Sequence, residues 1–181
     1  MRKRLVIGGV VLVAAGGLTL GLLLAGDGAA TQQPGVVATS APLPDVRGTT
    51  LAGMPFSTSD YHGRILVLNF WNPYCAPCRK EATVLDLAQG GLGPKGVVIA
   101  GVLFSNTNFP HDVPAARRFA RELGERYPTM DDPGGDIASA FGVPGIPTTV
   151  VADATGRIRY KVFGPLKKGE LESLIRRLQQ R

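Results

Sequence analysis

The chain carries its only two cysteines in one short stretch, Phe70-Trp71-Asn72-Pro73-Tyr74-Cys75-Ala76-Pro77-Cys78-Arg79-Lys80-Glu81. The residues that lead into it, 64–70, form a near-continuous apolar run, which is typical of a strand buried on both faces. A helical pattern follows from about Ala76 to Gln89, and we expect Gly90-Gly91 to end that helix. The sequence therefore places the cysteines where a buried strand gives way to a helix, with Cys75 at the helix N-terminus.

This placement indicates redox chemistry more than a structural role. Unpaired backbone N–H groups and the helix dipole favour an anion, and so stabilise a thiolate on Cys75. Pro77 fits the first helical turn, where its missing N–H removes no intrahelical bond. Cys78 lies close enough to attack a mixed disulfide formed at Cys75. Because a bridge that closes so short a loop adds little stability, we predict that the pair exchanges disulfides.

The apolar pattern elsewhere predicts an α/β fold. Further strands are expected at 96–103, 148–152 and 158–162, and further helices at 116–123 and 171–178. This order is a βαβ unit followed, after a helix, by a ββα unit. It predicts one mixed sheet flanked by helices.

Other uses of the cysteine pair are disfavoured. A zinc site needs about four ligands, and only His62 and His111 could join the cysteines, at spacings that match no metal motif. Covalent haem attachment requires a histidine after the second cysteine, where Arg79 stands. We therefore expect neither a metal nor another cofactor.

The N-terminal residues have the pattern of a targeting segment. A basic cluster, Arg2-Lys3-Arg4, precedes residues 5–26, which contain no charged side chain. That length suffices for one transmembrane helix, and the basic cluster predicts that the rest of the chain lies outside the cytoplasm. We expect residues 1–26 to be a signal anchor, 27–44 a flexible linker and 45–181 the folded domain. The alternative is a cleaved signal peptide, with Gly28-Ala29-Ala30 at the cut and a secreted product.

The positive charge does not indicate nucleic acid. The formal net charge is +6, but without residues 1–26 seventeen Lys and Arg face fourteen Asp and Glu. The remaining basic cluster lies on a helical pattern that also carries acids: Arg117, Arg118, Arg121, Glu122 and Glu125. A solvated helix face is the favoured interpretation.

The residues around the cysteines resemble the thioredoxin superfamily, and within it the extracytoplasmic TlpA/ResA/CcmG-like branch. The resemblance covers about Leu43 to the C-terminus. Its most specific features are 68–71 before the cysteines, Glu81 after them, and Gly142-Val143-Pro144-Gly145-Ile146-Pro147-Thr148-Thr149 downstream.

The resemblance implies roles for individual residues. Pro147 matches the cis-proline that faces the cysteine pair and, with the neighbouring Ile146, helps to hold an extended partner segment. Trp71 matches the family tryptophan beside the active site and is assigned to substrate binding; plain core packing would place it at the same position. Glu81 matches a carboxylate that relays a proton or tunes the thiol pKa values. The alternative for Glu81 is a solvated acid that complements the helix dipole.

Three departures from the family pattern bear on these roles. Asn69 replaces thioredoxin's buried aspartate, as is usual in this branch. Tyr74 stands before Cys75 where tryptophan is common, which alters the surface that faces a partner. Thr83 replaces a proline that kinks the active-site helix. The core chemistry of the cysteines is unaffected by all three.

The resemblance implies a membrane-tethered thiol-disulfide oxidoreductase that reduces protein disulfides, including those of apocytochrome c. One span cannot carry electrons, so a separate membrane protein must donate them. We further expect Cys75 to be more exposed and more acidic than Cys78. The alternatives are an oxidase or isomerase of secreted proteins, a copper- or partner-binding module, and a peroxiredoxin-like peroxidase. Peroxidases of that kind usually have Thr or Ser where Asn72 stands.

Overall fold

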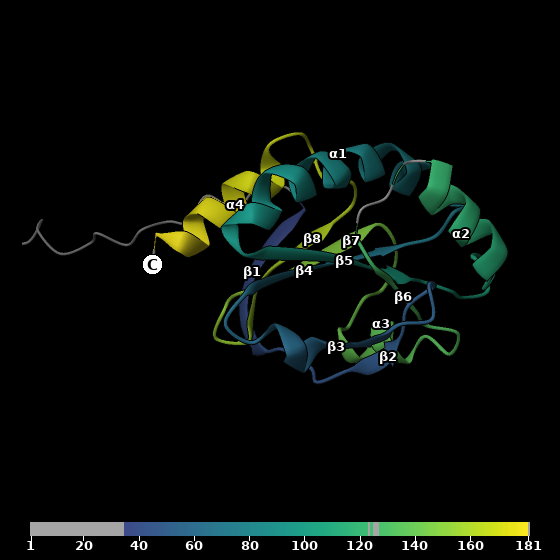
Figure 1. Ribbon diagram of the computed structural model, residues 1–181, viewed down its shortest axis with the longest axis horizontal. Coiled ribbons are helices and arrows are strands. Elements are labelled where there is room, and N and C mark those ends of the chain that lie inside the picture. The colour runs from purple at the N-terminus through teal and green to yellow at the C-terminus, as the bar shows by residue number, and fades with distance from the viewer. Residues whose placement is uncertain (1–34, 123, 125–126, 181) are drawn as a thin grey trace, which may run out of the picture. The chain divides into compact units, whose positions relative to one another are not determined.

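The computed structural model describes residues 35–122, 124 and 127–180. Within them, six strands form one sheet in the order β1-β8-β7-β4-β5-β6, and two more form a small hairpin, β2-β3 (Figure 1). The strands are β1 (Val36–Pro42), β2 (Arg47–Thr49), β3 (Pro55–Ser57), β4 (Ile65–Trp71), β5 (Val97–Leu103), β6 (Thr129–Asp131), β7 (Thr148–Ala152) and β8 (Arg157–Phe163). The helices are α1 (Ala76–Leu92), α2 (Val113–Glu122), α3 (Asp136–Ala140) and α4 (Glu170–Gln179), with short 3-10 turns at Thr58–Tyr61 and Gly93–Lys95.

The predicted mixed sheet is confirmed. Strand β4 lies at its centre, parallel to β5 and antiparallel to β7. Residues of β4 are buried on both faces because helices or the hairpin cover each side, which explains the continuous apolar run in the sequence. The βαβ unit is β4-α1-β5, and the ββα unit is β7-β8-α4.

Each face of the sheet has its own apolar core. Helices α1 and α4 cover one face (Figure 1), where Val67, Ile99 and Val151 pack against Leu85 and the inner residues of α4. Helix α3 and the β2-β3 hairpin cover the other face, where the alternate side chains of the same strands point. A third, smaller cluster surrounds the cysteines.

The predicted linker is wrong at its C-terminal end. Residues Val36–Pro42 form strand β1, which pairs antiparallel with β8 at the edge of the sheet, so the domain begins before residue 45. Only Val36 of this strand is fully buried. An edge strand gains its stability from backbone pairing with its neighbour, and so it needs no apolar pattern of its own.

The predicted end of the first helix is also wrong. Helix α1 continues through Gly90-Gly91 to Leu92, whose buried side chain joins the core beside α4. Packing of that last turn outweighs the low helix propensity of glycine. Strands β2, β3 and β6 and helix α3 were not expected. They have three to five residues each, and such short segments do not show a recognisable pattern of apolar residues in the sequence.

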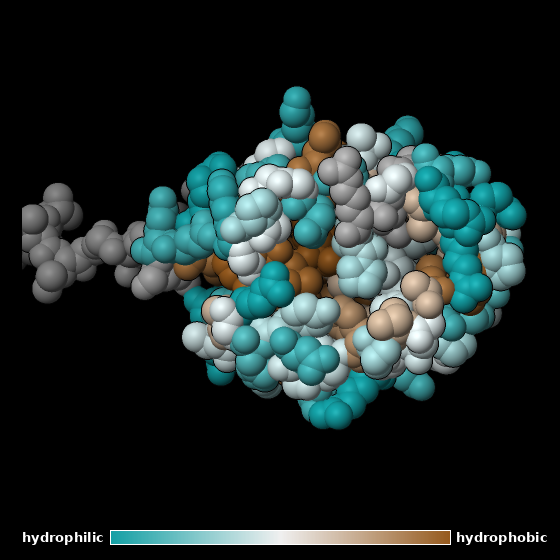
Figure 2. Space-filling model, viewed as in Figure 1, coloured by the Kyte–Doolittle hydropathy of each residue, from teal (hydrophilic) through white to brown (hydrophobic). Residues whose placement is uncertain are grey.

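Helix α2 presents the expected solvated basic face. Arg117, Arg118 and Arg121 are exposed, while Ala116 and Phe119 are buried. Figure 2 shows strongly hydrophilic residues gathered over this helix.

Among the residues that the structure describes, no helix combines the length and apolar character that crossing a bilayer requires. The predicted anchor, 1–26, and the linker up to residue 34 lie outside the described residues.

Candidate active site

Cys75 and Cys78 form a disulfide at the start of α1. Cys75 is the N-cap of the helix, and its Sγ accepts a hydrogen bond from the backbone N–H of Cys78 at 3.2 Å. Pro77 lies in the first turn, as predicted. The backbone donor and the helix dipole would both stabilise a negative charge on this sulfur once the disulfide is reduced. The geometry thus gives Cys75 a local source of thiolate stabilisation.

The two cysteines are equally buried in the disulfide state. Each is 2% exposed, so the expected difference in their exposure is not seen. The surrounding cluster is apolar and comes from the β2-β3 turn, strands β4 and β5 and helices α1 and α2: Leu51, Trp71, Ala82, Leu103, Ala116 and Phe119. These side chains cover Cys75, so its sulfur is not exposed to solvent even though the residue lies at the end of the helix.

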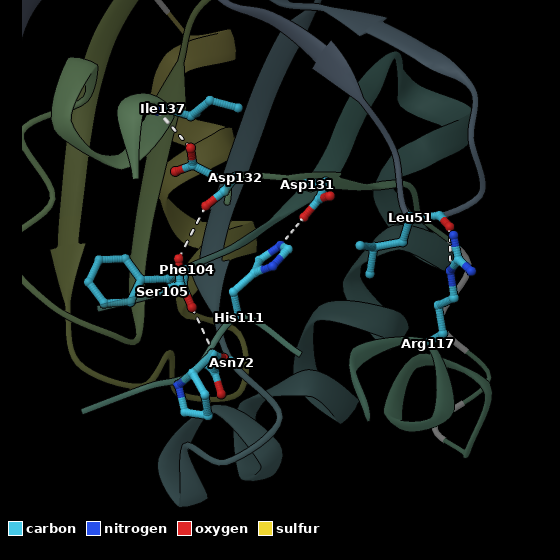
Figure 3. Close-up of polar contacts among 10 residues, drawn as sticks. Leu51, Asn72, Phe104, Ser105, His111, Arg117, Asp131, Asp132 and Ile137 are labelled. Carbon is cyan, nitrogen blue, oxygen red and sulfur yellow. Dashed lines mark hydrogen bonds and ion pairs between the residues drawn. The ribbon is translucent and has the colours of Figure 1, made fainter. Parts of the chain in front are cut away.

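Asn72 anchors the loop that carries Cys75. Its Nδ2 donates to the carbonyl oxygens of Phe104 at 2.8 Å and Pro110 at 3.1 Å, and its Oδ1 accepts from the N–H of Tyr74 at 3.0 Å. Figure 3 shows Asn72 lying against the carbonyl of Phe104. The residue is fully buried, with 0% exposure. Sequence reasoning assigned it no such role. The Asn-Pro dipeptide ahead of the motif signals a turn, but the two carbonyl groups that Asn72 binds lie more than thirty residues away in the sequence.

Tyr74 and Asp112 form a second link on the surface. The phenol of Tyr74, 54% exposed, donates to Asp112 Oδ2 at 2.5 Å. The other oxygen of Asp112 accepts from the N–H of Ala115 at 2.9 Å, at the start of α2. The hydrogen bond raises the pKa of Tyr74 and lowers the pKa of Asp112. The tyrosine beside the nucleophile is therefore held to the N-terminus of α2 by a residue that the sequence did not single out.

Glu81 is buried beneath the cysteine pair. It is 2% exposed, and it follows Cys78 by three residues on α1, which puts both on one helix face. Asn69 Nδ2 donates to its Oε1 at 2.6 Å, and the N–H of Leu166 donates to its Oε2 at 2.7 Å. Burial raises the pKa of Glu81 to about 7, opposed by these two hydrogen bonds and reinforced by the negative charge of Glu170. The alternative of a solvated acid in the first turn is therefore wrong.

Trp71 lies beside the cysteines but inside the core. It is 2% exposed, and its ring centroid is 5.1 Å from that of Phe119. Residues of α2 and the segment at Leu51 cover the indole, as they cover the equally buried cysteines. A part for Trp71 in substrate binding stays a prediction.

The segment at Ile146 and Pro147 meets the same cluster. The peptide bond between them is cis, as the resemblance implied, and Ile146 packs against the cluster that contains both cysteines. The carbonyl of Pro147 accepts from the N–H of Gly164 at 2.9 Å, and Thr148 Oγ1 donates to the carbonyl of Gly145 at 2.7 Å. These bonds fix the turn that brings Ile146 to the cysteines from a distant part of the sequence.

The described residues contain no group of three or more His, Cys, Asp and Glu side chains placed to hold a metal ion. His111 contacts Asp131 instead, with Nε2 and Oδ1 2.6 Å apart (Figure 3). This pair ties the segment before α2 to strand β6.

Comparisons with known proteins agree with this geometry. The Redoxin family model matches residues 38–175. The thiol:disulfide interchange protein HelX of Rhodobacter capsulatus is 36% identical over 126 residues, covering 68% of this chain and 66% of HelX. The thiol-disulfide oxidoreductase ResA of Bacillus thuringiensis is 28% identical over 130 residues, covering 72% of each chain.

A solved structure of a DsbF homologue from Corynebacterium diphtheriae has a TM-score of 0.68 at 30% identity, and the match covers 80% of this chain and 93% of that one. Its fold, the matched family and the disulfide at the start of α1 support one conclusion. The chain belongs to the Redoxin family within the thioredoxin superfamily, and it is a thiol-disulfide oxidoreductase similar to ResA and HelX.

Proposed function

We propose that this protein reduces disulfide bonds of other proteins outside the cytoplasm, tethered to the membrane by residues 1–26. The observation that carries the proposal is the Cys75–Cys78 pair at the N-terminus of α1, with the buried carboxyl of Glu81 one helical turn below it.

The reaction transfers two electrons from the dithiol to the partner. The Cys75 thiolate attacks one sulfur of the partner's disulfide, which forms a mixed disulfide and releases the partner's other sulfur as a thiolate that takes up a proton. Cys78 then loses its proton and attacks Cys75 Sγ, which releases the second partner thiolate. The partner leaves as a dithiol, and this chain is left with the Cys75–Cys78 disulfide.

Glu81 fits the task of taking the proton from Cys78. With a pKa of about 7 the carboxyl is present in both protonation states near neutral pH. When it is ionised, its charge disfavours a second negative charge on the nearby Cys78. Strongly oxidising pairs have a reduced form stabilised through the thiolate. A carboxylate that opposes the thiolate therefore favours a reductant.

Partner recognition falls to the residues around the pair. Ile146 is half-buried against the cysteine cluster, and the buried Pro147 precedes the first residue of β7. An extended partner segment laid along this turn would bring its sulfur to Cys75. Tyr74, next to Cys75 in the chain and held by Asp112, would also border the segment.

Regeneration needs an outside dithiol, because the chain holds only one redox pair. The predicted single span cannot carry electrons, so we propose a multi-span membrane protein as the donor. Apocytochrome c, implied by the family resemblance, is the proposed substrate because its paired cysteines must be reduced before haem is attached.

Two measurements test this function. A reduction potential of the Cys75–Cys78 couple near that of thioredoxin, about −270 mV, is expected, and one near about −120 mV would instead assign an oxidase. In the Cys78→Ser variant we expect Cys75 to remain covalently bound to partner proteins, which mass spectrometry would identify. The assignment would be contradicted if the Cys75→Ser variant captured partners through Cys78 while the Cys78→Ser variant captured none through Cys75.

A further inference from the structure

A cleft lies between helix α2 and the turn that joins β2 to β3. Its volume is about 550 Å³, within the usual range for binding sites. The turn is rigid: the N–H groups of Thr50 and Gly53 bond within it, and the N–H of Leu51 donates to Thr129 at the edge of the sheet. The walls are mainly apolar and aromatic, and include Leu51, Met54, Phe56, Tyr61 and Tyr127.

Two guanidinium groups stand on the α2 side of this cleft. Arg117 and Arg121 are four residues apart, so they share one face of the helix. Arg117 Nε donates to the carbonyl oxygen of Leu51 at 2.6 Å, and Figure 3 shows its side chain reaching from α2 to that carbonyl. This bond holds the planar group in place. A fixed guanidinium binds a carboxylate at a smaller entropic cost than a free one.

Among the described residues that line the cleft, two are basic and none is acidic. The neighbouring acid on α2, Glu122, lies 3.9 Å from Arg79 instead. Two cations beside an aromatic floor therefore favour a ligand that carries negative charge next to an apolar group.

We propose that this cleft docks an acidic peptide segment of a protein partner. One aromatic or large aliphatic side chain of the segment enters between Met54 and Tyr61, and its neighbouring carboxylates contact Arg117 and Arg121. Met54, 63% exposed, offers an apolar side chain to a partner at the cleft. A phosphodiester backbone would leave the apolar floor unused.

The cleft adjoins the redox centre through Leu51. This residue lines the cleft and also packs in the cluster that surrounds Cys75 and Cys78. A partner bound in the cleft would therefore contact Leu51, which itself packs in the cluster around the disulfide. That the partner is a redox partner rests on the proposed function; that the cleft binds an acidic segment does not.

The test uses the full chain in detergent, with the disulfide intact, and a dye-labelled pentapeptide with phenylalanine between two pairs of glutamates. Fluorescence anisotropy should show saturable binding that weakens with added salt. Replacing the glutamates by lysines should abolish it. Arg121→Glu should weaken binding about five- to tenfold, because it replaces an attraction by a repulsion. Arg121 is an exposed residue of α2, so the variant should fold normally, which circular dichroism checks.

Arg118→Glu is the matched control, since it makes the same charge change on an exposed residue of α2 that does not line the cleft. It should change binding by less than about twofold. Met54→Ser should remove the preference for phenylalanine over alanine in the peptide. Equal losses in the Arg118 and Arg121 variants, or equal binding of the lysine peptide, would show only diffuse electrostatics and overturn the proposal. So would an absence of binding.

The outcomes separate the two proposals. Failure to bind in a protein that exchanges disulfides normally overturns the docking site alone. Normal binding in a protein that exchanges no disulfides supports the docking site and overturns the proposed function alone.

Discussion

The two halves of helix α1 cover the same face of the sheet, but they bury different chemistry. The C-terminal half buries Leu85, Ala88 and Leu92 in an apolar core shared with α4. The N-terminal half buries a disulfide and a carboxyl, Glu81. Strand β4, which packs beneath α1, changes from apolar to polar in the same way. Val67 makes only apolar contacts, whereas Asn69, two residues later, donates hydrogen bonds to Glu81 and Thr149.

The contrast shows where this fold accepts an unfavourable burial. A buried carboxyl without partners would cost several kcal/mol, and even with two donors Glu81 keeps a pKa of about 7. The apolar half carries no such cost and supplies stability. We therefore expect substitutions in one half to change chemistry and substitutions in the other to change folding.

Cys75→Ser should remove essentially all disulfide exchange, because serine cannot form the mixed disulfide. Its free energy of unfolding should stay close to that of the wild type, since the lost bridge spans only three residues. Reduction of a disulfide-containing protein and urea unfolding measure the two quantities. Residual exchange at the wild-type rate would move the nucleophile to Cys78.

Leu85→Ala should do the reverse. The side chain is 1% exposed, so its truncation should lower the free energy of unfolding by about 2–5 kcal/mol. At temperatures where the variant remains folded, its exchange rate should match the wild type. A large drop in that rate would erase the proposed division between the halves of α1.

The pH dependence of stability should reveal Glu81. Its pKa rises from about 4.5 in the unfolded chain to about 7 in the folded one, so between these pH values the folded state binds the extra proton. Stability therefore falls as pH rises through this window, by an amount on the order of 3 kcal/mol. Urea unfolding of the oxidised protein at a series of pH values measures the slope.

In Glu81→Gln this contribution to the slope should vanish, and the pH profile of disulfide exchange should change with it, since the proposed proton acceptor is gone. Glu170→Gln, which removes the neighbouring charge, should reduce the slope without abolishing it. An unchanged slope in the Glu81 variant would assign the pH dependence elsewhere.

Alanine substitutions at two glycines should have the smallest effects on the free energy of unfolding, and the two effects should have opposite signs. A Cβ at Gly101 would lie 2.6 Å from Trp71 Nε1 and still closer to Thr129 Oγ1, so Gly101→Ala must displace the indole and should destabilise by about 1–3 kcal/mol. A Cβ at Gly91 meets nothing within 4 Å, so Gly91→Ala should stabilise α1 by about 0.5–1 kcal/mol. Thermal unfolding and the fluorescence of Trp71, the only tryptophan, report both. Fluorescence unaltered in the Gly101 variant would show that the indole does not depend on this contact.

Local patterns were enough to predict the redox centre and the main elements. The apolar run of β4, the start of α1 at Cys75 and the order of strands and helices each depend on residues near one another in sequence. Those predictions are confirmed, with ends that differ by a few residues. Where packing from a distant element intervened, as at Gly90-Gly91, the local rule failed.

The burial of Glu81, the enclosure of Trp71 and the strand at Val36 were decided only by the tertiary structure. Glu81 accepts a hydrogen bond from Leu166, which is 85 residues away, and Asn69 bonds to Thr149 across 80 residues. No window of sequence contains both members of such a pair. The identity of a residue fixes what it can donate, accept or ionise, but the dielectric around it and the partner that meets it are properties of the packed chain.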